Sequence, residues 1–238
     1  MSGHSKWNNI KRKKEKTDAQ KAKIFTKIGR EIAVAVREGG PDPASNSKLR
    51  DLIAKAKDNN VPNENIERAI KKAGADKTAY EQIMYEGYGP AGVAVLVDCL
   101  TDNRNRTAGD LRHYFDKYGG NLGQTGSVGF LFERKGVLVL ENEDLDEDKV
   151  MEDCLEAGAQ DFDFGAEAVE IYTAWNEVGA VREALEKKGY TFLSAQAEYV
   201  PSTYVRLDGE NAEKMEKLLD LLEEHDDVQE VWHNWDQD

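Results

Sequence analysis

The chain has 238 residues, of which 39% are apolar and 33% charged, and its formal net charge is -14 with a pI of about 4.9. This length allows one large domain or two to three small ones, and the acidic pI argues against a simple basic DNA-binding protein. No apolar run approaches the roughly 20 residues that span a bilayer, and no apolar stretch follows the basic N-terminus as a secretory signal requires. Cys99 and Cys154 form no CxxC pair. The sequence therefore predicts a cytoplasmic protein of a reducing compartment with no membrane partner.

The charge is divided unevenly along the chain. Residues 1–77 carry 19 Lys and Arg against 10 Asp and Glu, whereas residues 78–238 carry 13 against 36. The first segment is thus positive by nine charges and the second is negative by 23. Such a split indicates that the basic region binds a polyanion and that the acidic part of the chain does not.

Residues 18–77 are predicted to form three helices that share one core. Asp18 can cap a helix that ends near Glu38, where Gly39-Gly40-Pro41 follows. An apolar face on this helix opposes a basic one, which predicts one buried side and one side left in water. A second helix is predicted over 45–57 and a third over 62–74. The basic face of the first helix carries Lys23, Lys27, Arg30 and Arg37.

Beyond residue 80 the pattern alternates between strands and helices. Such alternation with short connections indicates split βαβ units. The predicted helices are 104–118, 146–157, 176–188 and 210–225. The predicted strands are 93–100, 127–133, 136–141, 167–174, 192–200, 203–207 and 228–235.

We therefore predict an α+β protein, with an N-terminal three-helix domain followed by two α/β lobes, one ferredoxin-like with the other inserted in it. The basic helical domain covers 1–77. The ferredoxin-like lobe combines 78–134, which give one β-α-β unit, with 203–238, which give another. The inserted lobe covers 135–202.

The densest basic block lies between Lys6 and Lys16, where Trp7 is followed by Lys11, Arg12, Lys13, Lys14 and Lys16. Lys and Arg side chains here can neutralise phosphates, and each contact releases counterions, so binding would weaken steeply as salt rises. Trp7 could stack on an unpaired base or anchor the segment. The alternative is a solvated tail whose Trp7 docks on the protein itself. The candidate nucleic-acid-binding residues are Lys6, Trp7, Lys11, Arg12, Lys13, Lys14, Lys23, Lys27 and Arg30.

Several other motifs predict no functional site. The segment GGNLGQTGSVG (119–129) lacks the Lys-Ser/Thr of a phosphate loop and leads into a predicted strand, so we expect a turn. The acidic run 141–149 lacks the Gly and Glu of a calcium loop, and the four histidines show no metal-ligand spacing. Phe130 and Phe132 alternate on a predicted strand without an RNA-recognition signature, so both are predicted to be core. We expect no metal and no cofactor.

Long motifs cover nearly the full chain. They are SGHSKWNNIKRKK, REIAVAVREGGPDPASNSKLR, AKDNNVPNENIERAIKKAG and the stretch from YEGYGPAGVAVLVDCL to GSVGFLFERKG. These motifs resemble the YebC/PmpR family of probable transcriptional regulatory proteins, which includes mitochondrial translational activators. The resemblance implies a helical domain with two α/β lobes around a cleft, a cytoplasmic role in gene expression and no catalytic chemistry.

The resemblance leaves two functions open. Some family members are described as DNA-binding transcriptional regulators, and others as ribosome-associated factors that help translation, including past proline-rich stretches. Either role makes nucleic acid, DNA or ribosomal RNA, the partner of the basic domain, and the second role adds the ribosome. No helix-turn-helix with base-reading side chains is apparent, so these residues do not explain sequence specificity on DNA. The leading hypothesis is a DNA-binding regulator, with the translation factor as the alternative.

Two further classes of function compete with these. An enzyme could use the cleft between the lobes, where Asp98, Asp102 and Asp110 could gather near the end of a strand. The sequence suggests no grouping of a nucleophile with a histidine and no set of metal ligands that would support an active site there. We therefore expect that the protein is not an enzyme. A protein adaptor could recruit a basic partner through its acidic lobes, or could fold those lobes back on its own basic domain.

Overall fold

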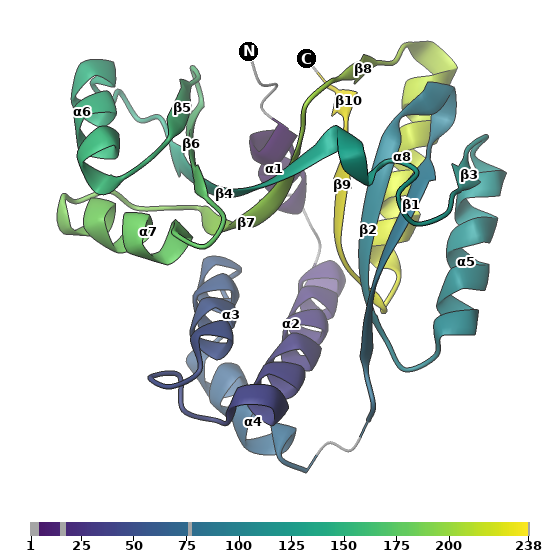
Figure 1. Ribbon diagram of the computed structural model, residues 1–238, viewed down its shortest axis with the longest axis horizontal. Helices are drawn as coiled ribbons and strands as arrows, with labels where there is room; N and C mark the ends of the chain where they lie inside the picture. The colour runs from purple at the N-terminus through teal and green to yellow at the C-terminus, as the bar shows by residue number, and fades with distance from the viewer. Residues whose placement is uncertain (1–4, 15–17, 76–77, 238) are drawn as a thin grey trace.

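The computed structural model describes residues 5–14, 18–75 and 78–237 and shows three packed parts (Figure 1). The helical part lies at the bottom of Figure 1, and the lobes formed by the two larger sheets lie side by side above it. Each lobe is a four-stranded antiparallel sheet with two helices on one face, so the fold is α+β, as predicted. None of the described helices combines the length and the apolar character that crossing a membrane requires.

The helical part consists of α2 (Asp18–Gly39), α3 (Ser47–Asp58) and α4 (Asn63–Ala73), close to the predicted bounds. Ile28, Ile32 and Leu49 are among the buried side chains of their shared core. Asn46 caps α3, because its side-chain oxygen accepts a hydrogen bond from the Leu49 amide at 3.0 Å. One apolar stripe on each helix thus produces a single small core.

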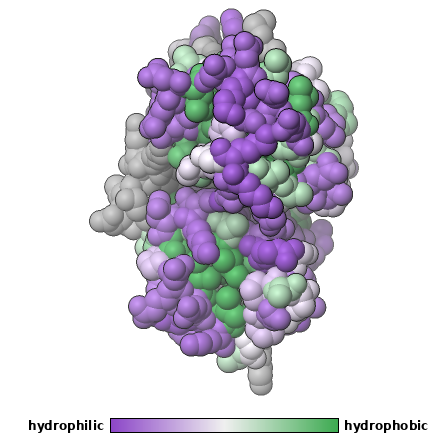
Figure 2. All heavy atoms as spheres, turned by 90° about the vertical axis from the view of Figure 1, so that its left-hand side faces the viewer, coloured by the Kyte–Doolittle hydropathy of each residue, from purple (hydrophilic) through white to green (hydrophobic). Residues whose placement is uncertain are grey.

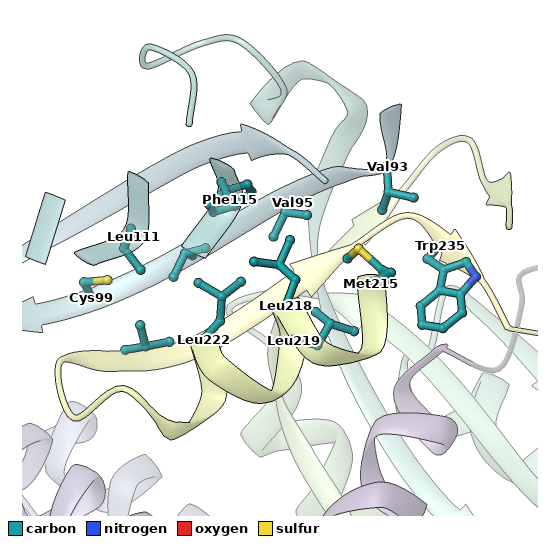
Figure 3. Close-up of a cluster of buried hydrophobic side chains, with 12 residues drawn as sticks. Val93, Val95, Cys99, Leu111, Phe115, Met215, Leu218, Leu219, Leu222 and Trp235 are labelled. Atoms are coloured by element: carbon teal, nitrogen blue, oxygen red, sulfur yellow. The ribbon is translucent and has the colours of Figure 1, made fainter. Parts of the chain in front are cut away.

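The first lobe is a sheet in the order β3-β1-β2-β9, with α5 and α8 on one face. Figure 3 shows the core between them, where Leu218 of α8 points toward Val95 of the sheet. The apolar residues of α8 recur at helical spacing and therefore share one face. The elements are β1 (Glu81–Tyr88), β2 (Ala94–Thr101), α5 (Arg104–Lys117), β3 (Asn121–Leu122), α8 (Gly209–Glu224) and β9 (Val228–His233).

The second lobe is a sheet in the order β5-β6-β4-β7, with α6 and α7 on one face. Leu138 and Leu140 belong to the core beneath these helices, whereas Val137 and Val139 belong to a second cluster on the opposite face. Because side chains alternate along a strand, β4 is buried on both faces. The elements are β4 (Phe132–Glu141), α6 (Glu147–Ala157), β5 (Asp161–Phe164), β6 (Ala168–Ala174), α7 (Val178–Lys187) and β7 (Ser194–Pro201).

The predicted strand over 127–133 is wrong. A 3-10 turn, η2 (Gly129–Leu131), occupies its centre, and β4 then continues as one strand where two were predicted. A Cβ atom at Gly136 would come within 2.3 Å of the Thr173 hydroxyl. The glycine therefore allows β4 and the Thr173 side chain to approach each other closely, and it does not interrupt the strand. Phe130, predicted to be core, is 74% exposed because it lies in the turn, whereas Phe132 is half-buried.

The ferredoxin-like lobe also uses different strands from those predicted. Segment 203–207 contributes only β8 (Val205–Arg206), which pairs in parallel with β10 (Trp235–Asp236) outside the main sheet. The unpredicted strands β1 and β3 complete that sheet instead. The β1 sequence EQIMYEGY mixes charged residues and glycine with apolar ones, which conceals the strand pattern.

The division of the chain into three domains remains our proposal. The helical core, the first sheet and the second sheet each bury a cluster of apolar side chains. These clusters fall within the proposed domains over 1–77, over 78–134 together with 203–238, and over 135–202, although Trp7 and Ile10 of the first segment pack in a cluster with the second lobe.

The glycine-rich segment 119–129 folds as a loop around a buried carboxylate. Glu86 of β1 is 6% exposed and accepts hydrogen bonds from the amides of Gly126, Val128 and Gly129 at 2.7–2.8 Å. Burial alone would raise the pKa of Glu86, but the three amide donors lower it. A side chain of β1 thus fixes the conformation of a loop about 40 residues later.

Candidate nucleic-acid interface

Trp7 anchors an additional helix, α1 (Ser5–Lys14), on the second lobe. This helix packs on the face of the sheet opposite α6 and α7, where the Trp7 indole, 7% exposed, lies against Val137 and Tyr172. The indole nitrogen donates to the Glu167 carboxylate at 2.9 Å, and the Trp7 amide donates to Glu170 at 2.9 Å. In this conformation the indole holds α1 in place and is not exposed for stacking on a base.

Two lysines of α1 contact carboxylates of the same lobe. Lys6 forms an ion pair with Glu198, and its side chain is only 12% exposed. Lys11 contacts Glu167 at 2.8 Å, and its side chain is 47% exposed. Because residues 6, 7, 10 and 11 lie on one side of a helix, a single face of α1 makes all of these contacts.

The basic face of α2 lies against the C-terminal end of α8. Lys23 and Lys27 donate hydrogen bonds to the backbone carbonyls of Glu224 and Glu223, at 3.1 Å and 2.6 Å. The last carbonyls of a helix lack intrahelical donors and lie at the negative end of the helix dipole. Cations of α2 therefore satisfy the end of α8.

Arg30, further along the same face of α2, pairs with the buried carboxylate of Asp227 at 3.1 Å. Asp227 is 3% exposed and also accepts hydrogen bonds from Thr101, Thr107 and Arg106 at 2.7–3.1 Å. Burial alone would raise the pKa of Asp227, but the hydrogen bonds from Arg106 and Thr107 lower it. The ionised carboxylate thus fixes the position of Arg30.

The structure brings the described candidate residues together in two groups. The group on α1 contacts the second lobe, and the group on α2 contacts the end of α8. Lys11 and Lys23 are the exposed members. The candidates whose side chains lie outside the described residues are Arg12, Lys13 and Lys14.

A cavity of about 260 Å³ lies where α2, α3 and both lobes meet. On its wall Lys55 pairs with Glu31 at 3.1 Å and with Glu230 at 3.3 Å. Burial alone would lower the pKa of Lys55, but the two carboxylates raise it. Nearby, burial raises the pKa of Asp98 to about 6, and the two glutamates add to this shift. The cavity is therefore bordered by paired charges of both signs.

Sequence reasoning missed a set of exposed cations on α3 and α4 that form no ion pair with any described carboxylate. Each of them lies off the apolar stripe of a predicted helix, which was the available signal. Figure 2 shows a stripe of hydrophobic surface over the lower, helical part of the molecule, with hydrophilic side chains beside it. The missed residues are Arg50, Lys57, Lys71 and Lys72.

The aspartates considered for an enzyme do not form one cluster. Asp102 pairs with Arg106 at 2.8 Å and Asp110 contacts His225 at 3.1 Å, whereas Asp98 is buried beside the Lys55 group. Within residues 5–14, 18–75 and 78–237, no group of three or more His, Cys, Asp and Glu side chains is arranged to hold a metal ion.

Profiles of two domains from one protein family match the chain. The TACO1/YebC protein N-terminal domain matches residues 5–76, and the TACO1/YebC second and third domain matches residues 80–235. The boundary between the two matches falls between α4 and β1. The matched segments therefore correspond to the helical part and to the two lobes together.

Relatives align with the chain from end to end. A "Probable transcriptional regulatory protein" of Caldicellulosiruptor bescii is 59% identical over 241 residues, which cover 100% of this chain and 99% of the relative. A protein of the same name from Acetivibrio thermocellus is 59% identical over 239 residues, with 99% of each chain covered. The crystal structure of a conserved hypothetical protein from Aquifex aeolicus, 48% identical, matches 92% of both chains with a TM-score of 0.82.

Proposed function

The chain belongs to the TACO1/YebC family, and from this premise we propose that it regulates gene expression by binding nucleic acid through its N-terminal helices. The names of its relatives, probable transcriptional regulatory proteins, support a role in transcription with DNA as the partner. In this proposal Lys and Arg side chains of α1 and α2 pair with phosphates, while the acidic lobes stay clear of the polyanion.

The main support for the proposal is the separation of charge between the basic N-terminal helices and the acidic lobes. Helix α1, SKWNNIKRKK, contains five cations and no acidic residue. The helical part adds exposed cations on α3 and α4, among them Lys57 and Lys71. The lobes would repel phosphate, because residues 78–238 carry 36 acidic side chains against 13 basic ones.

A ribosome-associated role in translation, with ribosomal RNA as the partner, is the second candidate. The cations are spread over several helices, an arrangement that suits backbone contacts with structured RNA at least as well as groove reading in DNA. Contacts of this kind give affinity and orientation without reading the base sequence.

A salt titration of binding tests the proposal. We would measure the affinity for a labelled DNA duplex and a labelled structured RNA by fluorescence anisotropy at 50 and 200 mM salt. The Arg12→Ala/Lys13→Ala variant leaves the docking contacts described above in place and should bind more weakly at low salt. Its slope of log K against log salt should fall in magnitude by roughly 2, since each phosphate contact contributes about 0.9 on duplex DNA.

The matched control is Lys187→Ala/Lys217→Ala, which removes the same charge from exposed positions of the lobes. This control should bind like the wild type. Unchanged binding by the α1 variant would overturn the proposal. Tight binding to RNA with none to DNA would select the translation role.

A further inference from the structure

The cations assigned to phosphate whose side chains the structure describes already have acceptors within the protein, namely Lys6, Lys11, Lys23, Lys27 and Arg30. We propose that the acidic lobes compete with nucleic acid for α1 and α2, so that this conformation is a self-masked state. Nucleic acid then binds fully only after the cations leave their internal acceptors. The inference rests on the proposed function and adds its regulation.

Carboxylates of the second lobe accept hydrogen bonds from the α1 lysines that we assign to phosphate. Glu167 accepts hydrogen bonds both from Lys11, at 2.8 Å, and from the Trp7 indole, at 2.9 Å. Glu198 holds Lys6 in the same way. Carboxylate and phosphate oxygens are both anionic acceptors for Lys, so the two compete directly for the same donors. We call this set of contacts the α1 docking contact.

Burial of Trp7 adds an apolar contribution to the α1 docking contact, in addition to its ion pairs. The indole packs with Val137, Val139 and Ala168 on the face of the sheet that α6 and α7 leave uncovered. Apolar burial persists when salt is added, whereas exposed ion pairs are screened. The helix is therefore held in one position, with a strength that salt reduces in part.

The cations of α2 are held by a different lobe. Lys23 and Lys27 contact carbonyls at the end of α8, and Arg30 contacts Asp227. The acidic lobes thus restrain the basic segment at two separate places. The hydrogen bonds and ion pairs described for α1 are all with the second lobe, which makes α1 the simpler helix to test.

The effect of masking on affinity follows from a two-state equilibrium. If α1 is released in only a fraction of molecules, the observed dissociation constant equals the intrinsic constant divided by that fraction. A variant that weakens the α1 docking contact raises the fraction and tightens binding. Among the described contacts, Glu167 supplies an ion pair to Lys11 and a charge-assisted hydrogen bond to the Trp7 indole, so its neutralisation should tighten binding by about 3- to 10-fold.

The test compares Glu167→Gln with Glu147→Gln. Both side chains are exposed, Glu167 by 62%, and both substitutions change the net charge equally, but Glu147 lies on α6 with no described contact to α1. Affinities for the labelled duplex and RNA would be measured at 50 and 300 mM salt. Glu167→Gln should bind about 3- to 10-fold more tightly than Glu147→Gln at 50 mM, and this advantage should shrink at 300 mM. In the absence of nucleic acid, the amides of α1 should exchange hydrogen faster in Glu167→Gln.

Each outcome bears on a different claim. Equal affinities and equal α1 exchange for the two variants, with Arg12→Ala/Lys13→Ala still weak, would overturn the masking and leave the proposed function standing. Absence of salt-dependent binding by every variant would overturn the proposed function and the masking together.

Discussion

Three buried carboxylates of the first lobe have pKa values that their neighbours shift in opposite directions. Glu86 and Asp227 each accept at least three hydrogen bonds, and these lower the pKa although burial opposes the change. Asp98, 9% exposed, accepts hydrogen bonds from Gln82, and burial raises its pKa to about 6. The number of donors around a buried acid therefore decides the direction in which its pKa shifts.

Asp98→Asn should stabilise the protein relative to the wild type above pH 6. The pKa of Asp98 is raised from 3.8 to about 6 in the folded state, so the contribution of Asp98 to stability is greatest below pH 4 and is lost as the pH rises through 6. Asparagine does not ionise. The difference in unfolding free energy should move in favour of the variant by on the order of 2 kcal/mol between pH 4 and pH 8. Urea denaturation at both pH values measures this, and a difference independent of pH would contradict it.

Helix starts agree well with the sequence prediction, whereas several strands do not. Asn46, Asn103 and Asp146 each accept a hydrogen bond from the backbone amide three residues later, so local sequence determines where α3, α5 and α6 begin. Strand β1 depends on pairing with β2 and β3, and its own sequence has no clean alternation. Pairing between distant segments decides which of these stretches become strands, and a local pattern does not contain that information.

Two glycines of the second lobe should respond oppositely to alanine. At Gly136 in β4 a Cβ atom would lie 2.3 Å from the Thr173 hydroxyl and 2.4 Å from Val178, so Gly136→Ala should destabilise by about 2 kcal/mol. At Gly179 in α7 the space is open and alanine favours the helix, so Gly179→Ala should stabilise by up to about 1 kcal/mol. Urea denaturation of the two variants compares them, and similar stabilities would refute the close approach at β4.

Ion pairs between distant residues join the three parts of the molecule. Arg182 of α7 forms two hydrogen bonds of 2.9 Å with Asp58 at the end of α3. Lys55 of α3 contacts Glu230 of β9 in the first lobe. The helical part is thus connected to both lobes through charged side chains.

Arg182→Ala should lower the free energy of unfolding by about 2–3 kcal/mol, because it leaves the Asp58 carboxylate without its partner. Burial already raises the pKa of Asp58, and loss of Arg182 should raise it further. The destabilisation should therefore be larger at pH 8 than at pH 5. Urea denaturation measures both values, with Lys187→Ala on the same helix as the control. An equal effect at the two pH values would argue against a coupled pair.

The candidate interface was predictable in part. The sequence grouped Lys23, Lys27 and Arg30 on one helix face, and the structure brings all three to the end of α8. The carbonyls that they contact lie 196–201 residues later in the chain, so the sequence could indicate a basic face but not what lies against it. Their role toward nucleic acid stays a prediction.

The loop that Glu86 holds in place bears on how the protein could contact a partner. In a phosphate loop the backbone amides donate hydrogen bonds to a bound anion. Here the Glu86 carboxylate of the protein itself accepts those hydrogen bonds. The loop therefore keeps one shape in the absence of any ligand, and it ends at Phe130, whose ring is 74% exposed. A contact made through this ring would cost little conformational entropy, because its support is rigid beforehand.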